Sequence, residues 1–184
     1  MMNTIRKNED ERRHRRIRRV AGFMSRCCAL LALALPICMA LIWAYVEQML
    51  PPRLPAQLLA DLSVADRIGG FVLSLFVVGI AVWGLVSLAT LFARFRRGDI
   101  FDVRAAILLR RFALTVLLLP FANLVTEGLT TAWLSRNAAP GEGMIALSLT
   151  SHDLFFGVIG VLLLMIAWIL RDAAAISKEN RLIV

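Results

Sequence analysis

The sequence predicts an all-α fold, a four-span transmembrane helix bundle with both termini in the cytoplasm. Three observations support this prediction. First, 59% of the 184 residues are apolar and the mean hydropathy is +0.74, whereas soluble domains usually contain about 45–50% apolar residues. Second, Lys and Arg concentrate in alternate polar stretches. Third, four apolar runs contain no Lys or Arg, and each is near the roughly 20 residues that cross a bilayer core; they span about residues 27–46, 69–93, 112–134 and 154–170.

The basic residues set the predicted topology. Residues 1–26 contain nine Lys or Arg, residues 94–111 contain six, and the stretch after residue 170 contains three, which makes 18. The two other polar stretches together contain three. Because Lys and Arg next to a span resist translocation, the side with 18 is predicted to be cytoplasmic.

The chain is predicted to consist of a basic cytoplasmic tail, residues 1–26, and a four-span membrane domain, residues 27–184. The tail is dense enough in arginine to bind polyanions, and the nearest polyanion is an anionic lipid surface. Nucleic acid is a less favoured partner, because no aromatic residues alternate with the arginines to stack on bases. The first run is interpreted as an uncut anchor, because it continues past any plausible signal cleavage site.

Two features of the first and second runs concern packing. Trp43 falls near the outer end of its span, a depth at which Trp often settles at the lipid interface. In the second run, small residues recur at steps of four, seven and three, which would let another helix approach closely. This stripe, interpreted as packing rather than as a ligand groove, consists of Gly70, Ser74, Ala81 and Gly84.

The polar stretch between the second and third runs is predicted to be a helical hairpin. Gly98 follows three arginines, as at a helix C-terminus, and Asp102 can cap a third helix that begins about ten residues before its apolar run. The hairpin is either a simple positive anchor or a docking surface for a cytoplasmic protein or anionic lipid. The candidate docking or lipid-contact residues, including two near the C-terminus, are Arg97, Asp99, Phe101, Arg104, Arg111, Glu179 and Asn180.

Polar residues inside a span are candidate functional residues by default, because burying them in lipid is costly. The third run contains Asn123, Thr126 and Glu127 beyond Pro120, a residue that loosens a helix. Asn123 and Glu127 are four residues apart and share a helix face. They are expected either to form hydrogen bonds to a partner helix or to line a small polar pocket that opens outward. A third alternative places Glu127 simply at the outer interface.

The fourth run is expected to begin at Ser151, as an N-cap, with Asp153 in the first turn. At the far end, the apolar residues 182–184 are expected either to pack on Phe101 or to bind a partner.

No residue pattern indicates an enzyme. Cys27, Cys28 and Cys38 are interpreted as small apolar residues of the first helix, and the two histidines lack the ligand spacing of a metal site. No phosphate-binding loop or nucleophile motif is present in the sequence. We therefore expect no catalytic residues, no metal and no cofactor.

Two segments carry a family resemblance. They are RRGDIFDVRAAILLRRFALTVLLLP and LSLTSHDLFFGVIGVLLLMIAWILRDAAAISKENRLIV. Together with the four-span layout, they resemble the bacterial membrane-protein family named domain of unknown function 2975, over about residues 27–184. The shared pieces are the hairpin from Gly98 to Phe101 and the ending that begins at Glu179 and Asn180. The resemblance implies an inner-membrane protein, often encoded beside a small helix-turn-helix regulator.

From these observations the expected function is that of an interaction or regulatory module in the membrane. The alternative is a small transporter or exporter subunit that acts as an oligomer. The expected partners are anionic lipid headgroups, a cytoplasmic protein and further copies of the chain.

Overall fold

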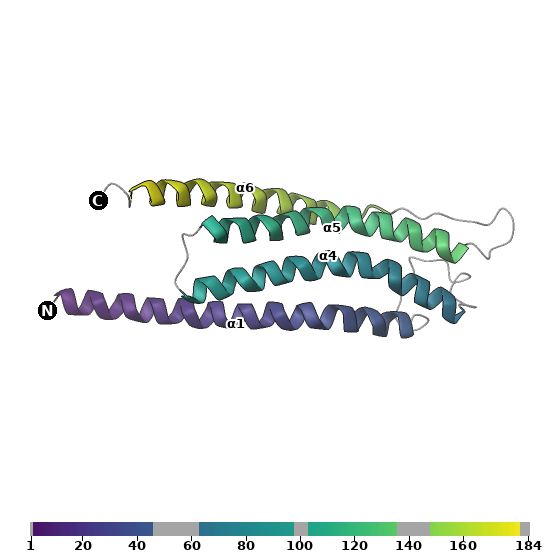
Figure 1. Cartoon of the computed structure of the whole chain (residues 1–184), viewed down its shortest axis with the longest axis horizontal. Coiled ribbons are helices and arrows are strands. Elements are labelled where there is room, and N and C mark those ends of the chain that lie inside the picture. The colour runs from purple at the N-terminus through teal and green to yellow at the C-terminus, as the bar shows by residue number, and fades with distance from the viewer. Residues whose placement is uncertain (1, 46–62, 98–102, 136–147, 181–184) are drawn as a thin grey trace.

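The computed structural model describes residues 2–45, 63–97, 103–135 and 148–180, with side chains described within 18–175 of these ranges. The described chain is all-helical (Figure 1). All four of its helices are long and apolar enough to cross a membrane, as expected of a multi-pass membrane protein. They are α1 (Met2–Ala44), α4 (Val64–Arg97), α5 (Val103–Ser135) and α6 (Ser151–Asn180).

Each helix is longer than the apolar run that predicted it. At about 1.5 Å per residue, the 43 residues of α1 extend about 65 Å, roughly twice the thickness of a bilayer core. The basic residues 2–26 therefore lie on the same helix as the first span. Helix α5 begins at Val103, which confirms that the third helix starts well before its apolar run. The predicted caps Gly98 and Asp102 lie outside the described residues.

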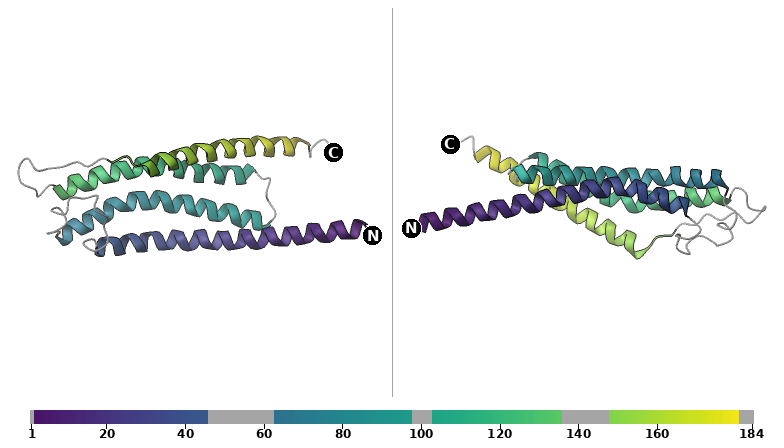
Figure 2. Two further views of the ribbon diagram at one scale, coloured as in Figure 1. Left: turned by 180° about the vertical axis from the view of Figure 1, so that it is seen from behind. Right: turned by 90° about the horizontal axis from the view of Figure 1, so that it is seen from below.

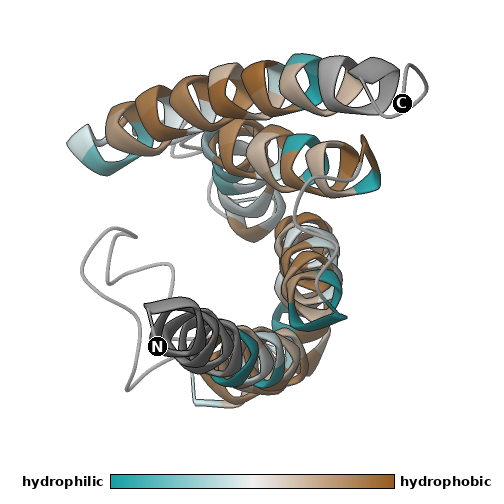
Figure 3. Cartoon of the chain, turned by 90° about the vertical axis from the view of Figure 1, so that its left-hand side faces the viewer, coloured by the Kyte–Doolittle hydropathy of each residue, from teal (hydrophilic) through white to brown (hydrophobic). Residues whose placement is uncertain are grey.

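The four helices form an open arc rather than a closed bundle. The extensive contacts are those of α1 with α4, α4 with α5, and α5 with α6. Viewed from one end, α6 and α1 lie at opposite ends of the arc (Figure 3), and α6 crosses the others obliquely (Figure 2). Lipid covers apolar surface as well as protein does, so no hydrophobic force closes the arc in a membrane.

Both chain ends lie at the same end of the molecule (Figures 1 and 2). We call this the basic end, because it carries the described arginines at the start of α1, the end of α4, the start of α5 and the end of α6. We call the other the opposite end. The basic part of α1 projects beyond the neighbouring end of α4 (Figure 1).

The stripe of small residues on α4 does pack against other helices, but on two sides. Gly70 lies directly against the Trp43 ring of α1, and a Cβ added there would overlap that ring. Gly84 lies against Thr115 of α5, whose Cγ2 would be 2.5 Å from an added Cβ. Small residues thus bring α4 close to both neighbours.

Trp43 is buried against α4, so it does not serve as a lipid-facing anchor. Only 7% of its surface is exposed. Its indole N–H donates to the Ser74 hydroxyl over 3.0 Å, and that hydroxyl donates to the Gly70 carbonyl over 2.9 Å. The indole therefore finds its acceptor on a neighbouring helix instead of at the membrane surface.

Two helices at the opposite end begin with a carboxylate that closes the first turn. Asp66 accepts hydrogen bonds from the backbone N–H and the hydroxyl of Ser63, just before α4. Asp153 does the same for Thr150, just before α6. Ser151 was the expected N-cap of α6, but the N-cap is Thr150, one residue earlier. Asp153 is then the third residue of the helix, where its carboxylate reaches the backbone N–H and the hydroxyl of Thr150.

Candidate functional site

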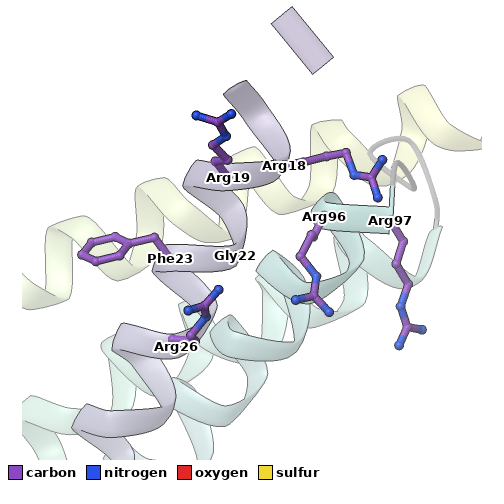
Figure 4. Close-up of a pocket in the computed structure, with 7 residues that line it drawn as sticks. All are labelled: Arg18, Arg19, Gly22, Phe23, Arg26, Arg96 and Arg97. Carbon is purple, nitrogen blue, oxygen red and sulfur yellow. The ribbon is translucent and has the colours of Figure 1, made fainter. Parts of the chain in front are cut away.

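Five arginines of α1 and α4 lie near one another at the basic end, and we call them the arginine cluster. They line an open hollow of about 520 Å³ together with Gly22 and Phe23, and no carboxylate is among the described residues of its lining. In Figure 4, Arg18 extends toward the end of α4, whereas Arg19 and Phe23 point away from it. All five guanidinium side chains are exposed. The cluster consists of Arg18, Arg19, Arg26, Arg96 and Arg97.

Close packing of α1 on α4 brings the cluster together. Gly22 has no side chain to hold the helices apart, and a Cβ there would lie 3.3 Å from Cδ of Arg96. Just beyond it, the Ser25 hydroxyl donates to the Ala89 carbonyl of α4 over 2.9 Å. On α1, residues 18, 22 and 26 follow at steps of four and so share one face. The arginines of two helices are thereby held at the same level.

The arrangement suits an anion with several oxygens. Guanidinium groups bind phosphate through paired N–H donors, and several like charges gathered at one place repel each other until a counterion is bound. Phe23 is 63% exposed beside the arginines.

The structure distributes the predicted docking residues over several places. Arg97 belongs to the arginine cluster. Arg104 and Arg111 are exposed on α5 at the same end of the molecule. Glu179 and Asn180 end α6, but their side chains lie outside the described set. Asp99, Phe101 and residues 182–184 fall outside the described residues altogether.

A second candidate site lies at the opposite end, where all four helices contribute to one cavity of about 560 Å³. We call it the polar cavity. The three predicted intramembrane residues, Asn123, Thr126 and Glu127, are all in its wall. The full lining is Met39, Ile42, Trp43, Ser74, Val77, Asn123, Thr126, Glu127, Thr130, Ser148, Thr150, His152, Asp153 and Phe156.

Two carboxylates face the polar cavity, and each is oriented by a hydroxyl. Glu127 accepts a hydrogen bond of 2.6 Å from the Ser148 hydroxyl and one of 3.3 Å from the Ser148 backbone N–H. Asp153 accepts from Thr150 at the start of α6. No Lys or Arg is part of the lining, so the described walls carry negative charge.

Three polar side chains of α5 face the cavity without a protein partner. In the described part of the chain, Asn123, Thr126 and Thr130 make no side-chain hydrogen bond, whereas Thr131 and Thr115 donate to carbonyls of their own helix. Thr130 is only 8% exposed. The amide and the two hydroxyls can therefore form hydrogen bonds to a polar guest in the cavity.

Several residues of these sites were not among the sequence candidates. Thr130 follows Glu127 by three positions on the same helical face, so helical periodicity alone could have identified it. Arg18, Arg26 and Arg96 were recognised only as basic residues, because the sequence does not show that α1 and α4 meet at Gly22. Ser148, His152 and Phe156 reach the cavity through the placement of α6, for which the sequence carries no signal.

Comparisons with known proteins identify no relative: no protein-family model, no curated protein and no solved structure matches this chain. The resemblance to the family named domain of unknown function 2975 therefore stays a prediction.

Proposed function

We propose that this protein is a membrane-embedded interaction module whose basic end faces the cytoplasm and binds the phosphate groups of anionic lipids. The observation that carries the proposal is the arginine cluster, in which five arginines from two helices line one hollow with no carboxylate among its described lining residues. On this proposal the protein is not an enzyme. The arginine cluster holds the basic part of α1 at the cytoplasmic leaflet of the bacterial inner membrane. The projecting basic helix is presented to a cytoplasmic protein, which this protein regulates.

The distribution of charge supports this orientation. The basic end carries both termini (Figure 1) and most of the 21 Lys and Arg residues. Such a bias favours the cytoplasmic side. In addition, a basic residue near an anionic leaflet contributes about 1 kcal/mol to membrane binding. The same residues would thus set the topology and hold the lipid.

The test is lipid retention by the purified protein, measured by native mass spectrometry during titration with phosphatidylglycerol or with zwitterionic phosphatidylcholine. We expect selective binding of the anionic lipid. The double substitution Arg18→Gln with Arg96→Gln removes one guanidinium from each helix. At about 1 kcal/mol per arginine, it should weaken phosphatidylglycerol binding by roughly 30-fold.

The matched control is Arg110→Gln with Arg171→Gln, two arginines at the same end that line a separate groove between α5 and α6. This pair should leave the anionic lipid bound nearly as tightly as in the wild type. Equal loss in both double variants would show that the overall charge, and not the arginine cluster, attracts the lipid. Equal binding of the two lipids by the wild type would also overturn the proposal.

A second candidate function is that of a small transporter or exporter subunit acting as an oligomer. The polar cavity favours it, because all four helices contribute to a polar space at the opposite end. Substrate sites of transporters are built from such convergent polar groups in membrane helices. Proteoliposomes that accumulate or release a cavity ligand only when the protein is present would support this function; binding without movement across the bilayer would exclude it.

A further inference from the structure

The polar cavity has the chemistry of a ligand site that is separate from the arginine cluster. The wall carries the Glu127 carboxylate, and the described residues of the lining include no Lys or Arg. A carboxylate attracts a cation at close range. From this charge, the unpaired hydroxyls and the apolar remainder of the wall, we propose that the cavity binds a primary organic ammonium ion with an aromatic or aliphatic body.

The hydrogen-bonding groups fit the head of such a ligand. A primary ammonium has three N–H donors and no acceptor. Glu127 retains acceptor capacity beyond its bonds to Ser148, because a carboxylate accepts about four hydrogen bonds. Asn123 and Thr130 on the same face of α5 offer a carbonyl oxygen and a hydroxyl, neither of which is bonded within the described residues. Together these groups can satisfy all three donors.

The rest of the wall fits the body of the ligand. Met39, Ile42 and Val77 provide an apolar surface, and Phe156 adds a ring that is 46% exposed. An aromatic face attracts a cation in addition to apolar groups. The volume of about 560 Å³ lies within the range of roughly 300–1,000 Å³ typical of sites for small molecules.

The proposal does not depend on lipid binding by the arginine cluster, because the two sites lie at opposite ends and share no residue. Failure of one measurement therefore leaves the other unaffected.

The experiment is calorimetric titration of the full chain in nanodiscs of zwitterionic lipid, with empty nanodiscs as the blank. The probe is benzylammonium. Benzyl alcohol is the uncharged comparison of nearly the same shape, and benzyltrimethylammonium is a cation without N–H donors. We expect benzylammonium to bind at least tenfold more tightly than either comparison. Equal binding of benzylammonium and benzyl alcohol, or no binding to the folded protein, would overturn the proposal.

Two variants locate the site, with the melting temperature as the check on folding. Glu127→Gln should remove the preference for benzylammonium over benzyl alcohol. Its control, Asp172→Asn, changes an exposed carboxylate near the other end of α6 and should bind like the wild type. Wild-type affinity in Glu127→Gln, or equal losses in both variants, would contradict the assignment.

If Glu127→Gln fails to fold, Thr130→Val tests whether the polar cavity binds benzylammonium. Valine has the same shape but no hydroxyl, and the Thr130 hydroxyl has no partner to lose among the described residues. The variant should therefore melt no lower than the wild type, yet bind benzylammonium several-fold more weakly. Unchanged affinity would remove this wall of α5 from the site.

Discussion

At the scale of single residues, the contact between Trp43 and Gly70 shows how little space separates α1 from α4. The Trp43 ring occupies the position that a side chain at residue 70 would need. The indole N–H donates to the hydroxyl of Ser74, one turn along the same face of α4. The interface at this level thus depends on one residue without a side chain and one with a short hydroxyl.

The first prediction compares two glycines of α4. Gly70→Ala forces its methyl group into the Trp43 ring and should lower the stability of the helix assembly by about 1–3 kcal/mol, the usual cost of overpacking. Gly79→Ala is the matched control, because a Cβ there meets no described atom within 4 Å. Reversible unfolding in mixed detergent measures both. Equal stability of the two variants would mean that Trp43 does not occupy this position in the membrane.

Part of this residue-level picture follows from the sequence. The recurrence of small residues on α4 predicts close packing, and Gly70 and Gly84 are indeed close to neighbouring helices. The burial of Trp43 could not be predicted, since a tryptophan near the end of a span can satisfy its N–H either at the lipid interface or on another helix. The choice depends on which helix lies next to it.

At the scale of elements, the start of α4 is fixed by a reciprocal pair. The hydroxyl of Ser63 donates to the carboxylate of Asp66 over 2.6 Å and accepts a bond of 3.3 Å from its backbone N–H. Such a cap satisfies N–H groups that a helix otherwise leaves unpaired. Nearby, Arg67 donates to the carbonyl of Ala44, the last residue of α1. The end of one helix and the start of the next are thus linked.

The second prediction follows from this cap. Ser63→Ala removes the hydroxyl and should lower the free energy of unfolding by about 1 kcal/mol, as for other N-caps. Thr90→Ala, also on α4, is the control. Its exposed hydroxyl bonds only to the carbonyl of Val86 in the same helix, so the change should be small. A loss at Thr90 as large as that at Ser63 would contradict the capping role.

Helix positions are the part of the fold that the sequence predicts best. An apolar run of about 20 residues between charged stretches has few alternatives to a membrane helix. Three of the four predicted spans lie wholly inside helices, and α1 covers the first span as far as Ala44. The first and last residues of the helices are less predictable. A helix continues beyond the membrane until residues of low helix propensity or a capping residue end it. This is why α1 includes the basic segment and why α6 is capped at Thr150.

The α5 face that lines the polar cavity is partly predictable in the same way. Asn123 and Glu127 share a face by spacing alone, and Thr130 extends that face. Whether such a face meets a helix or a cavity depends on how far the neighbouring helices stand apart. In this fold the start of the obliquely crossing α6 (Figure 2) lies beside α5 and brings His152 to the wall, a placement that local sequence does not specify.

At the scale of the whole molecule, the two ends differ in charge and in shape. The basic end gathers arginines from two helices around an open hollow, and the opposite end has an open cavity whose wall includes two carboxylates. The arc of helices (Figure 3) could not be predicted from the sequence, because spans of similar hydropathy give no order of packing. The charge difference between the ends could be predicted from the sequence, because it follows from counting Lys and Arg in alternate polar stretches.

The orientation of these two ends is the central claim of the proposed function, and thiol labelling in intact spheroplasts tests it most directly. In a background with the three cysteines replaced by Ala, single cysteines are introduced as Asp172→Cys at the basic end, and as Tyr45→Cys or Leu149→Cys at the opposite end. All three positions are exposed. A maleimide that cannot cross membranes should label positions 45 and 149 at once, and position 172 only after the membrane is permeabilised. Immediate labelling of position 172 together with protection of positions 45 and 149 would contradict the account, because the arginine cluster would then face away from the cytoplasm.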